Sequence, residues 1–168
     1  MPFTPYHFGP ALLLSVLLFP FLDVTTVMIA SVILDLEPIT ILILGLPLPL
    51  HGFFHTYLGA TIVALALSAM IWPFRSYLNQ ITSFFGLHQK SNSRNIILAS
   101  LVGVYFHIFL DSFLYVEMIP FYPLLGNPFL GVVSSGSVYM FCVIAGLFGI
   151  VSYAIRFFYL QQKSNPDT

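Results

Sequence analysis

Long apolar segments alternate with short polar ones along this chain, and that alternation predicts membrane-spanning helices. The apolar segments cover residues 8–22, 24–46, 51–72, 95–116 and 129–158. A transmembrane helix needs about 20 predominantly apolar residues. Four of the five segments reach that length, whereas the first would cross tilted or only in part. The pattern predicts an all-α integral membrane helical bundle with about five transmembrane helices.

The polar segments predict how the spans are connected. The only extended polar stretch is 76–94, which we expect to be a loop, with a short amphipathic surface helix over 77–87. A second loop, 117–128, is rich in proline. We predict one transmembrane domain over residues 1–160 and a polar C-terminal tail over 161–168.

The composition places the chain in lipid. Of its 168 residues, 58% are hydrophobic and only 7% are charged, whereas a soluble domain carries about 25% charged residues. The lipid bilayer is therefore the expected partner. A net charge of -1 gives no reason to expect nucleic acid. The single cysteine, Cys142, excludes an intramolecular disulfide framework, and the sequence fixes no oligomeric state.

The basic residues predict the orientation of the chain. They fall in two places, the polar loop and the C-terminal region: Arg75, Lys90, Arg94, Arg156 and Lys163. With five crossings both places lie on one face, which the excess of positive charge makes cytoplasmic. We therefore expect a multi-pass protein of the cell membrane whose C-terminus is cytoplasmic.

Two pairs of ionisable residues occur at a spacing of four in otherwise apolar segments. These pairs are His51 with His55 and His107 with Asp111. Residues four apart lie on one face of a helix. An ionisable side chain inside a membrane span is costly unless it is paired or ligated, so both pairs are functional candidates. Packing is the alternative, since His107 and Asp111 could simply hydrogen-bond one another.

A third group of ionisable residues interrupts the second apolar segment. Asp35 and Glu37 are two residues apart and would point in opposite directions on a straight helix. Pro38 follows them and predicts a kinked or broken helix. The carbonyl groups freed by such a break should face protein rather than lipid.

The predicted topology brings these groups together near the outer side of the membrane. Asp111 lies about 24 Å along a helix that starts inside, within a core of about 30 Å. Asp35 lies past the midplane on the helix that starts near Asp23, and His51 begins its helix at the outer face. His7 precedes the first segment and falls on the same side if that segment crosses.

Imidazole and carboxylate groups together predict a divalent metal site, with zinc as the expected ion. The candidate metal ligands are the histidines and aspartates of these groups: His7, Asp35, His51, His55, His107 and Asp111. A zinc ion lowers the pKa of its water from 15.7 to about 7. Glu37 or Asp35 could then act as the catalytic base.

This chemistry predicts a membrane-embedded, metal-dependent hydrolase. The outer face has no lysine or arginine to bind a phosphate group. We therefore expect a lipid-like or small-molecule substrate: an ester or amide reached from the membrane, or a phosphoester held by metal ions. The alternative is a small transporter or channel for metal ions or protons. A conduction path needs polar groups in the inner half, which offers little beyond Asp23.

The arrangement of these motifs resembles the membrane-bound metal-dependent hydrolase family, small multi-span inner-membrane proteins of bacteria and archaea. The resemblance is carried by five segments in order: residues 4–10, 35–37, 51–56, 107–111 and 122–128. Many members have an arginine after the first histidine of the pair, where this chain has Gly52. The resemblance implies a metal site formed by His7, Asp35, Glu37, His51, His55, His107 and Asp111.

Overall fold

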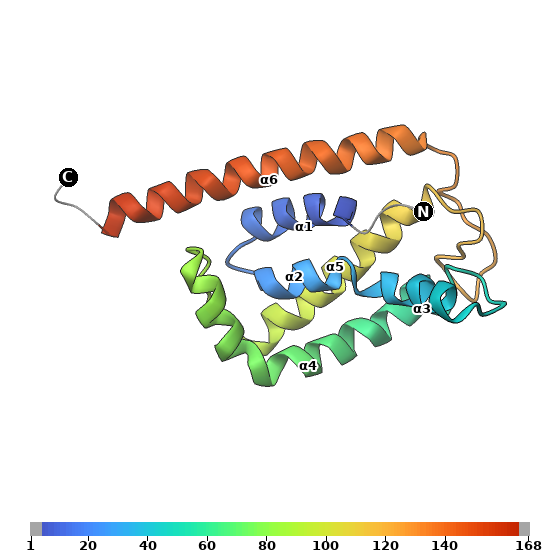
Figure 1. Ribbon diagram of the computed structural model, residues 1–168, viewed down its shortest axis with the longest axis horizontal. Coiled ribbons are helices and arrows are strands. Elements are labelled where there is room, and N and C mark those ends of the chain that lie inside the picture. Colours follow the sequence, from blue (N-terminus) through green and yellow to red (C-terminus); the bar gives the residue numbers. More distant parts are fainter. Residues whose placement is uncertain (1–4, 165–168) are drawn as a thin grey trace.

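A computed structural model describes residues 5–164, and within that range the regular structure is entirely helical (Figure 1). The elements are α1 (Pro5–Leu17), α2 (Val24–Ala30), the 3-10 turn η1 (Ile33–Asp35), α3 (Leu36–Leu44), the 3-10 turn η2 (Phe53–His55), α4 (Tyr57–Phe84), α5 (Ser93–Ser112) and α6 (Ser135–Ser164).

Four helical segments of the described chain are long and apolar enough to cross a membrane. They are Val24–Leu44, Tyr57–Phe84, Ser93–Ser112 and Ser135–Gln162. The prediction of an all-α chain is confirmed for the described residues, and these four segments fit the predicted spans by length and composition. The count is four rather than about five, because α1 has only 13 residues and a helix of that length spans about 20 Å.

Helix α5 lies at the centre of the bundle. It packs against α2 and α4, while α1 packs against α6 and α2; Figure 1 shows α6 and α4 on opposite sides of these inner helices. Small residues allow the close approach of α5 to α2. A Cβ atom at Gly103 would lie 2.4 Å from the Cβ atom of Ala30, and Ala30 is fully buried. Such contacts are typical of helix packing in membranes.

The predicted break in the second apolar segment is confirmed. Asp23 caps the start of α2 by accepting the Thr26 N–H at 2.9 Å. The α-helix stops at Ala30, and the chain passes through η1 before α3 resumes. Pro38 lies in the first turn of α3; it has no N–H, and its ring clashes with the carbonyl four residues earlier in a regular helix. The break places the Ser31 and Asp35 region inside the protein.

Two boundary predictions are wrong. Residues 77–84 form no separate surface helix, because α4 continues through Pro73 to Phe84. Figure 1 shows this helix bending sharply, which the missing N–H of a proline explains. Helix α6 also continues to Ser164, so the first four residues of the predicted tail are helical. Residues 165–168 lie outside the described chain.

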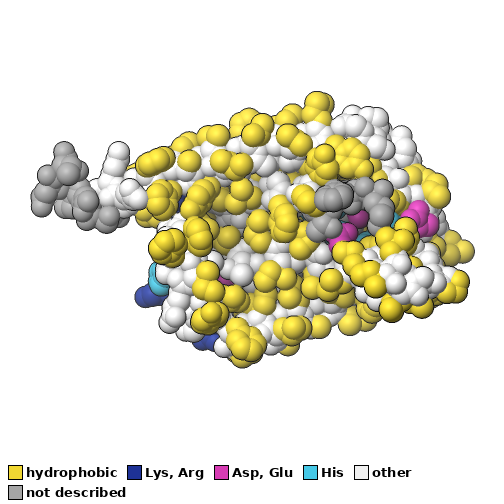
Figure 2. All heavy atoms as spheres, in the orientation of Figure 1, with side chains coloured by type: hydrophobic (Ala, Val, Ile, Leu, Met, Phe, Trp, Pro, Cys, Tyr) yellow, Lys and Arg dark blue, Asp and Glu magenta, His cyan; other side chains and the backbone are white. Residues whose placement is uncertain are grey.

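The charged side chains separate to the two ends of an apolar body. Figure 2 shows hydrophobic side chains along the length of the molecule, with lysine and arginine at one end and most of the visible acidic side chains toward the other; Asp23 is the exception, since it bonds to Ser91 in the loop that carries Lys90 and Arg94. At the basic end, Gln89 accepts the Val24 N–H at 2.9 Å and donates to the carbonyl of Leu22 at 2.9 Å. The acidic end holds the candidate site.

Candidate metal centre

Five of the predicted ligands lie close together in the structure, although they belong to four separate elements. His7 belongs to the first turn of α1, Asp35 to η1 and His55 to η2. His107 and Asp111 lie one turn apart near the end of α5. The break between α2 and α3 matters here, because it turns Asp35 inward to 6% exposure.

Four of these residues form a compact group, which we call the four-residue cluster: Asp35, His55, His107 and Asp111. One ligand atom from each lies within 4.8 Å of all the others. All four side chains are buried, and an imidazole or carboxylate group without a partner is costly to bury. A cation held between these atoms would supply the missing partner.

Most of the donor atoms in the cluster make no hydrogen bond. Within the described chain, Nε2 of His55, Nε2 of His107 and both carboxylate oxygens of Asp111 are buried without a hydrogen bond. Nε2 of His107 lies 3.2 Å from Oδ2 of Asp111 and 3.9 Å from Oδ1 of Asp35. A tetrahedral ion with bonds of about 2.0–2.1 Å separates its ligand atoms by about 3.3 Å. The spacing therefore suits ligands that share one ion.

Both histidines of the cluster are held in the tautomer that a metal requires. His107 donates from Nδ1 to the main-chain carbonyl of Ser31 at 2.8 Å. A carbonyl can only accept, so Nδ1 carries a proton and Nε2 is the nitrogen left for the cluster. His55 makes the equivalent bond to the carboxylate of Glu37 at 2.7 Å. Metal-ligating histidines almost always have such a partner on the other ring nitrogen.

Burial supports the neutral form of His55. Loss of water around the ring lowers the pKa of His55 below its ordinary value, and the hydrogen bond to Glu37 opposes this effect only in part. The neutral imidazole is the form that binds a metal ion.

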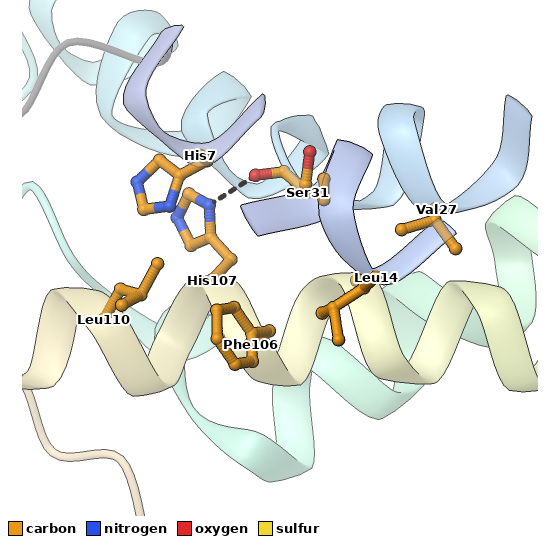
Figure 3. A pocket seen from close by; sticks show the side chains of 9 residues that line it. His7, Leu14, Val27, Ser31, Phe106, His107 and Leu110 are labelled. Carbon is orange, nitrogen blue, oxygen red and sulfur yellow. Dashed lines mark hydrogen bonds between the residues drawn. The ribbon is translucent and has the colours of Figure 1, made fainter. Parts of the chain in front are cut away.

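His7 lies beside the cluster. Its Nε2 is 3.3 Å from Oδ1 of Asp111, and its ring stacks on that of His107 with centroids 4.0 Å apart. Figure 3 shows the two rings side by side, together with the hydrogen bond from His107 to Ser31. Both ring nitrogens of His7 are buried and make no hydrogen bond in the described chain, although Nε2 is within ion-pair distance of Asp111. His7 can therefore support Asp111 or serve as a further ligand.

The structure places Glu37 behind His55 rather than in the cluster. One carboxylate oxygen of Glu37 holds Nδ1 of His55, and the other lies 3.5 Å from the N–H of Phe54. This geometry favours a positioning role over the predicted role of catalytic base. Asp35, the other predicted base, lies in the cluster itself.

His51 and His55 do not lie on one helix. The prediction that they share a helical face is therefore wrong. Thr56 has an extended backbone and caps the start of α4 by accepting the Gly59 N–H at 3.0 Å. His55 therefore lies in a 3-10 turn, and His51 precedes it in a proline-rich loop. His51 is outside the four-residue cluster. Its Nδ1 lies 2.8 Å from Oε1 of Glu117, the first residue of the predicted proline-rich loop.

The cavities around the cluster are of two kinds. A small enclosed cavity of about 10 Å³ adjoins His7 and His107 (Figure 3), about the space that one water molecule needs. Two larger pockets flank η2, one of about 300 Å³ that includes His51 and one of about 450 Å³ that includes Glu37. Neither large pocket is lined by Asp35, His107 or Asp111, so the cluster is enclosed by its neighbours.

Sequence reasoning missed three contributors to this region. The Ser31 carbonyl orients His107, Tyr115 stacks on His51 with ring centroids 3.8 Å apart, and Glu117 pairs with His51. Of the three, only Glu117 could have been singled out from the sequence, because it is an acidic residue six positions after Asp111 in a chain with few charges. The other two depend on tertiary contacts.

Comparison with known proteins adds no assignment. No protein-family model matches the chain, and neither a curated protein nor a solved structure is similar to it.

Proposed function

We propose that this protein is a membrane-embedded, metal-dependent hydrolase. The observation that carries the proposal is the four-residue cluster, in which buried imidazole and carboxylate atoms converge and most of them make no hydrogen bond. Donor sets of imidazole and carboxylate are typical of zinc, which is the ion we expect. The set contains no thiolate, and two histidines with a carboxylate are the ligands of some catalytic zinc sites.

The protein residues would hold and orient the ion. His55 and His107 present Nε2, while Asp35 and Asp111 present carboxylate oxygens. When bound, such an ion activates water and polarises the bond under attack. Glu37 and the Ser31 carbonyl keep the two rings turned toward the site.

The surroundings support a substrate that arrives from the membrane. The pocket of about 450 Å³ lies between α3 and α4, and its lining is apolar apart from Glu37 and Thr40. Helix α3 exposes large apolar side chains beside this pocket, among them Leu36 and Ile43. A lipid-like ester, amide or phosphoester is the substrate class that such surroundings favour.

We also propose that the cluster faces the outer side of the membrane and the C-terminus faces the cytoplasm. Figure 2 shows lysine and arginine side chains at the end of the molecule opposite most of the acidic ones. In the sequence, the basic residues lie in the last turns of α4, in the loop to α5, at the start of α5 and in the last turns of α6. Lysine and arginine are enriched on the cytoplasmic side of membrane proteins.

A transporter or channel for ions is the weaker candidate. The helical segments between the cluster and the basic end are 8–22, 24–34, 57–74, 95–106 and 135–155, and their sequences contain no Asp, Glu, His, Lys or Arg. Ser68 and Ser100 are buried there, but Ser68 bonds to the carbonyl of Ala64 and to Ser100 itself. Nothing in this half offers a path of ligands for an ion.

The proposal is tested by hydrolysis assays on the full chain purified in detergent. The probes are p-nitrophenyl octanoate for ester cleavage and bis(p-nitrophenyl) phosphate for phosphoester cleavage. The proposal expects release of p-nitrophenol that a chelator stops, that added zinc restores, and that Asp111→Asn abolishes. The control is His88→Gln, because His88 lies in the distant polar loop and bonds only to Asn79 at 3.3 Å. Hydrolysis that continues at the same rate after a chelator has removed the metal would contradict the proposal.

A further inference from the structure

The turn between α1 and α2, residues 18–23, exposes apolar side chains at one end of the molecule. Figure 1 shows this α1–α2 turn at the same end as the last turns of α4 and α6. Leu18 is 39% exposed and Phe21 is 66% exposed, while Leu17 at the end of α1 is 63% exposed. Four helical segments of the described chain are long and apolar enough to span a membrane, so this apolar surface suits contact with lipid.

Lys90 is fixed beside the α1–α2 turn by both of its neighbours in the chain. Gln89 donates from Nε2 to the carbonyl of Leu22 at 2.9 Å, and Ser91 donates from Oγ to Oδ2 of Asp23 at 2.5 Å. Lys90 itself is exposed. Its ammonium group is therefore carried by a segment that bonds to the turn on both sides.

Two arginines lie next to the same turn. Arg94 directly precedes Asn95, whose Nδ2 donates to the carbonyl of Pro20 at 3.1 Å. Arg156 comes from α6, and its Cζ lies 3.5 Å from the centroid of the Phe19 ring. With the lysine, three basic side chains from three segments of the chain are therefore gathered around one turn.

These three basic side chains have no carboxylate partner within the described chain. The ion pairs that residues 5–164 form all involve a histidine. The acidic residue at the turn, Asp23, already accepts hydrogen bonds from Thr26 and Ser91. Nε of Arg156 is buried without a hydrogen bond, and a buried polar group without a partner is costly. An anion at the turn would supply the missing acceptor.

The surroundings of Arg156 combine charge with apolar surface. Its stacking on Phe19 fixes the plane of the guanidinium group, and a guanidinium group bonds to phosphate through two parallel N–H donors. On the same helix, Ile155 is 66% exposed and Phe158 is 63% exposed. A ligand that matches these surroundings has a negative headgroup attached to apolar chains.

We propose that the α1–α2 turn binds the phosphate headgroup of an anionic membrane lipid through Arg156, Lys90 and Arg94, with the acyl chains against the exposed apolar side chains of the turn and of α6. Basic pockets between transmembrane helices are known sites for anionic headgroups. Free phosphate would leave the apolar surface without a partner, which favours the lipid.

This lipid site is separate from the candidate metal centre. Helix α1 lies between them, with His7 in its first turn and the α1–α2 turn after its last residue, Leu17. The inference therefore requires neither a bound metal nor the proposed hydrolysis, and it holds or fails independently of both.

Native mass spectrometry of the full-length protein in detergent tests the site by counting bound lipids. The probes are phosphatidylglycerol and phosphatidylcholine with the same acyl chains, and the competitor is inorganic phosphate. The proposal expects one saturable phosphatidylglycerol, weaker binding of phosphatidylcholine, and little displacement by phosphate at the concentration of the lipid. Equal binding of the two lipids would overturn the inference. Displacement by equimolar phosphate would show a site for free anions and would also overturn it.

Arg156→Gln should lower the affinity for phosphatidylglycerol about tenfold or more, the effect of losing one hydrogen bond to a charged group. Arg75→Gln is the matched control, because Arg75 also stacks on an aromatic ring, that of Trp72 at 4.0 Å, and donates to the Trp72 carbonyl at 3.4 Å. This control removes the same charge outside the α1–α2 turn and should keep the wild-type affinity. Equal losses in the two variants would show diffuse attraction to the basic end and overturn a defined site.

Two further variants guard against a change in folding and against binding elsewhere. Lys90 is exposed, so Lys90→Gln should fold normally and still bind phosphatidylglycerol more weakly than the wild type. Wild-type affinity in both Lys90→Gln and Arg156→Gln would overturn the inference. Folded Asp111→Asn should bind the lipid as the wild type does, because Asp111 belongs to the cluster. Loss of the lipid from this variant would place it at the metal centre instead and overturn the inference.

Discussion

His107 donates its Nδ1 proton to the main-chain carbonyl of Ser31, 2.8 Å away, in the gap between α2 and η1. A carbonyl inside an intact helix bonds to an N–H four residues later. The break in the helix frees this carbonyl, and the freed group orients a candidate ligand on another helix. The hydrogen bond to His107 therefore has two effects. It pairs a carbonyl that an apolar environment would not allow to stay unpaired, and it orients the His107 ring.

This relationship depends on the close contact between α2 and α5, which Gly103→Ala should disturb. The added Cβ atom would lie 2.4 Å from Cβ of Ala30 and 3.0 Å from the carbonyl oxygen of Val27. Overpacking of this kind costs about 1–3 kcal/mol, and it should also move Ser31 away from His107. We expect a lower free energy of unfolding in detergent and weaker zinc binding.

The matched control for that change is Gly136→Ala. A Cβ atom at Gly136 would meet nothing closer than 3.8 Å. This variant should keep the stability and zinc affinity of the wild type. Equal behaviour of the two variants would contradict the packing account of α2 against α5.

Glu37→Gln tests whether Glu37 orients His55 or takes part in the reaction. The substitution keeps the shape of the side chain but removes the charge that accepts the proton of His55 at 2.7 Å. Loss of such a partner weakens metal affinity by about 10–100-fold. Competition with a zinc chelator measures the affinity. An unchanged affinity with lost hydrolysis would instead make Glu37 the catalytic base.

His7→Gln tests the support that α1 gives to the cluster. His7 lies 3.3 Å from Asp111 but is not one of the four residues whose donor atoms converge. We therefore expect zinc to remain bound, with an affinity lowered by about 10–100-fold, the range for a residue that positions a ligand. Complete loss of zinc, equal to that of Asp111→Asn, would show that His7 is an essential ligand.

Because His51 and Glu117 form a pair, the free energy of unfolding of the protein should depend on pH. Burial alone would raise the pKa of Glu117, but the hydrogen bond from His51, a hydrogen bond to its own backbone and the charge of His51 together hold the pKa below its ordinary value. A depressed carboxylate pKa contributes stability above the pKa of the unfolded chain, about 4.3. That contribution is lost as the pH falls through the lower folded value.

The measurement is the thermal midpoint of wild type and Glu117→Gln between pH 3 and pH 7. The wild type should exceed the variant at pH 7, and the difference should shrink below about pH 4.3. Because the side chain of Glu117 is 35% exposed, the effect should be small. A difference that stays constant across this range would contradict the pairing.

Much of the site followed from the sequence because the chain has so few ionisable residues. Once the segment is predicted to be helical, helix geometry places His107 and Asp111 on one face. Pro38 predicted the break in the helix that turns Asp35 inward. The sequence predicted His7 on the same side as Asp111 only if the first segment crosses, and the 3.3 Å distance between them depends on the packing of α1.

Other features depend on contacts that no local pattern encodes. The pairing of His51 with Glu117 joins two loops 66 residues apart. The start of α4 at Tyr57 depends on the cap that Thr56 provides, whereas apolar periodicity extended the predicted helix back to His51. Periodicity alone could not show that α4 continues through Pro73, because a proline can kink a helix as well as end it.

The central claim is that Asp35, His55, His107 and Asp111 hold one ion together. The most direct test is the zinc content of purified wild type, His107→Gln and Asp111→Asn, measured by mass spectrometry beside His88→Gln. The account predicts near-stoichiometric zinc in the wild type and in His88→Gln, and almost none in folded His107→Gln and Asp111→Asn. Wild-type protein that binds no transition metal even after zinc is added, or variants that keep it, would contradict the account.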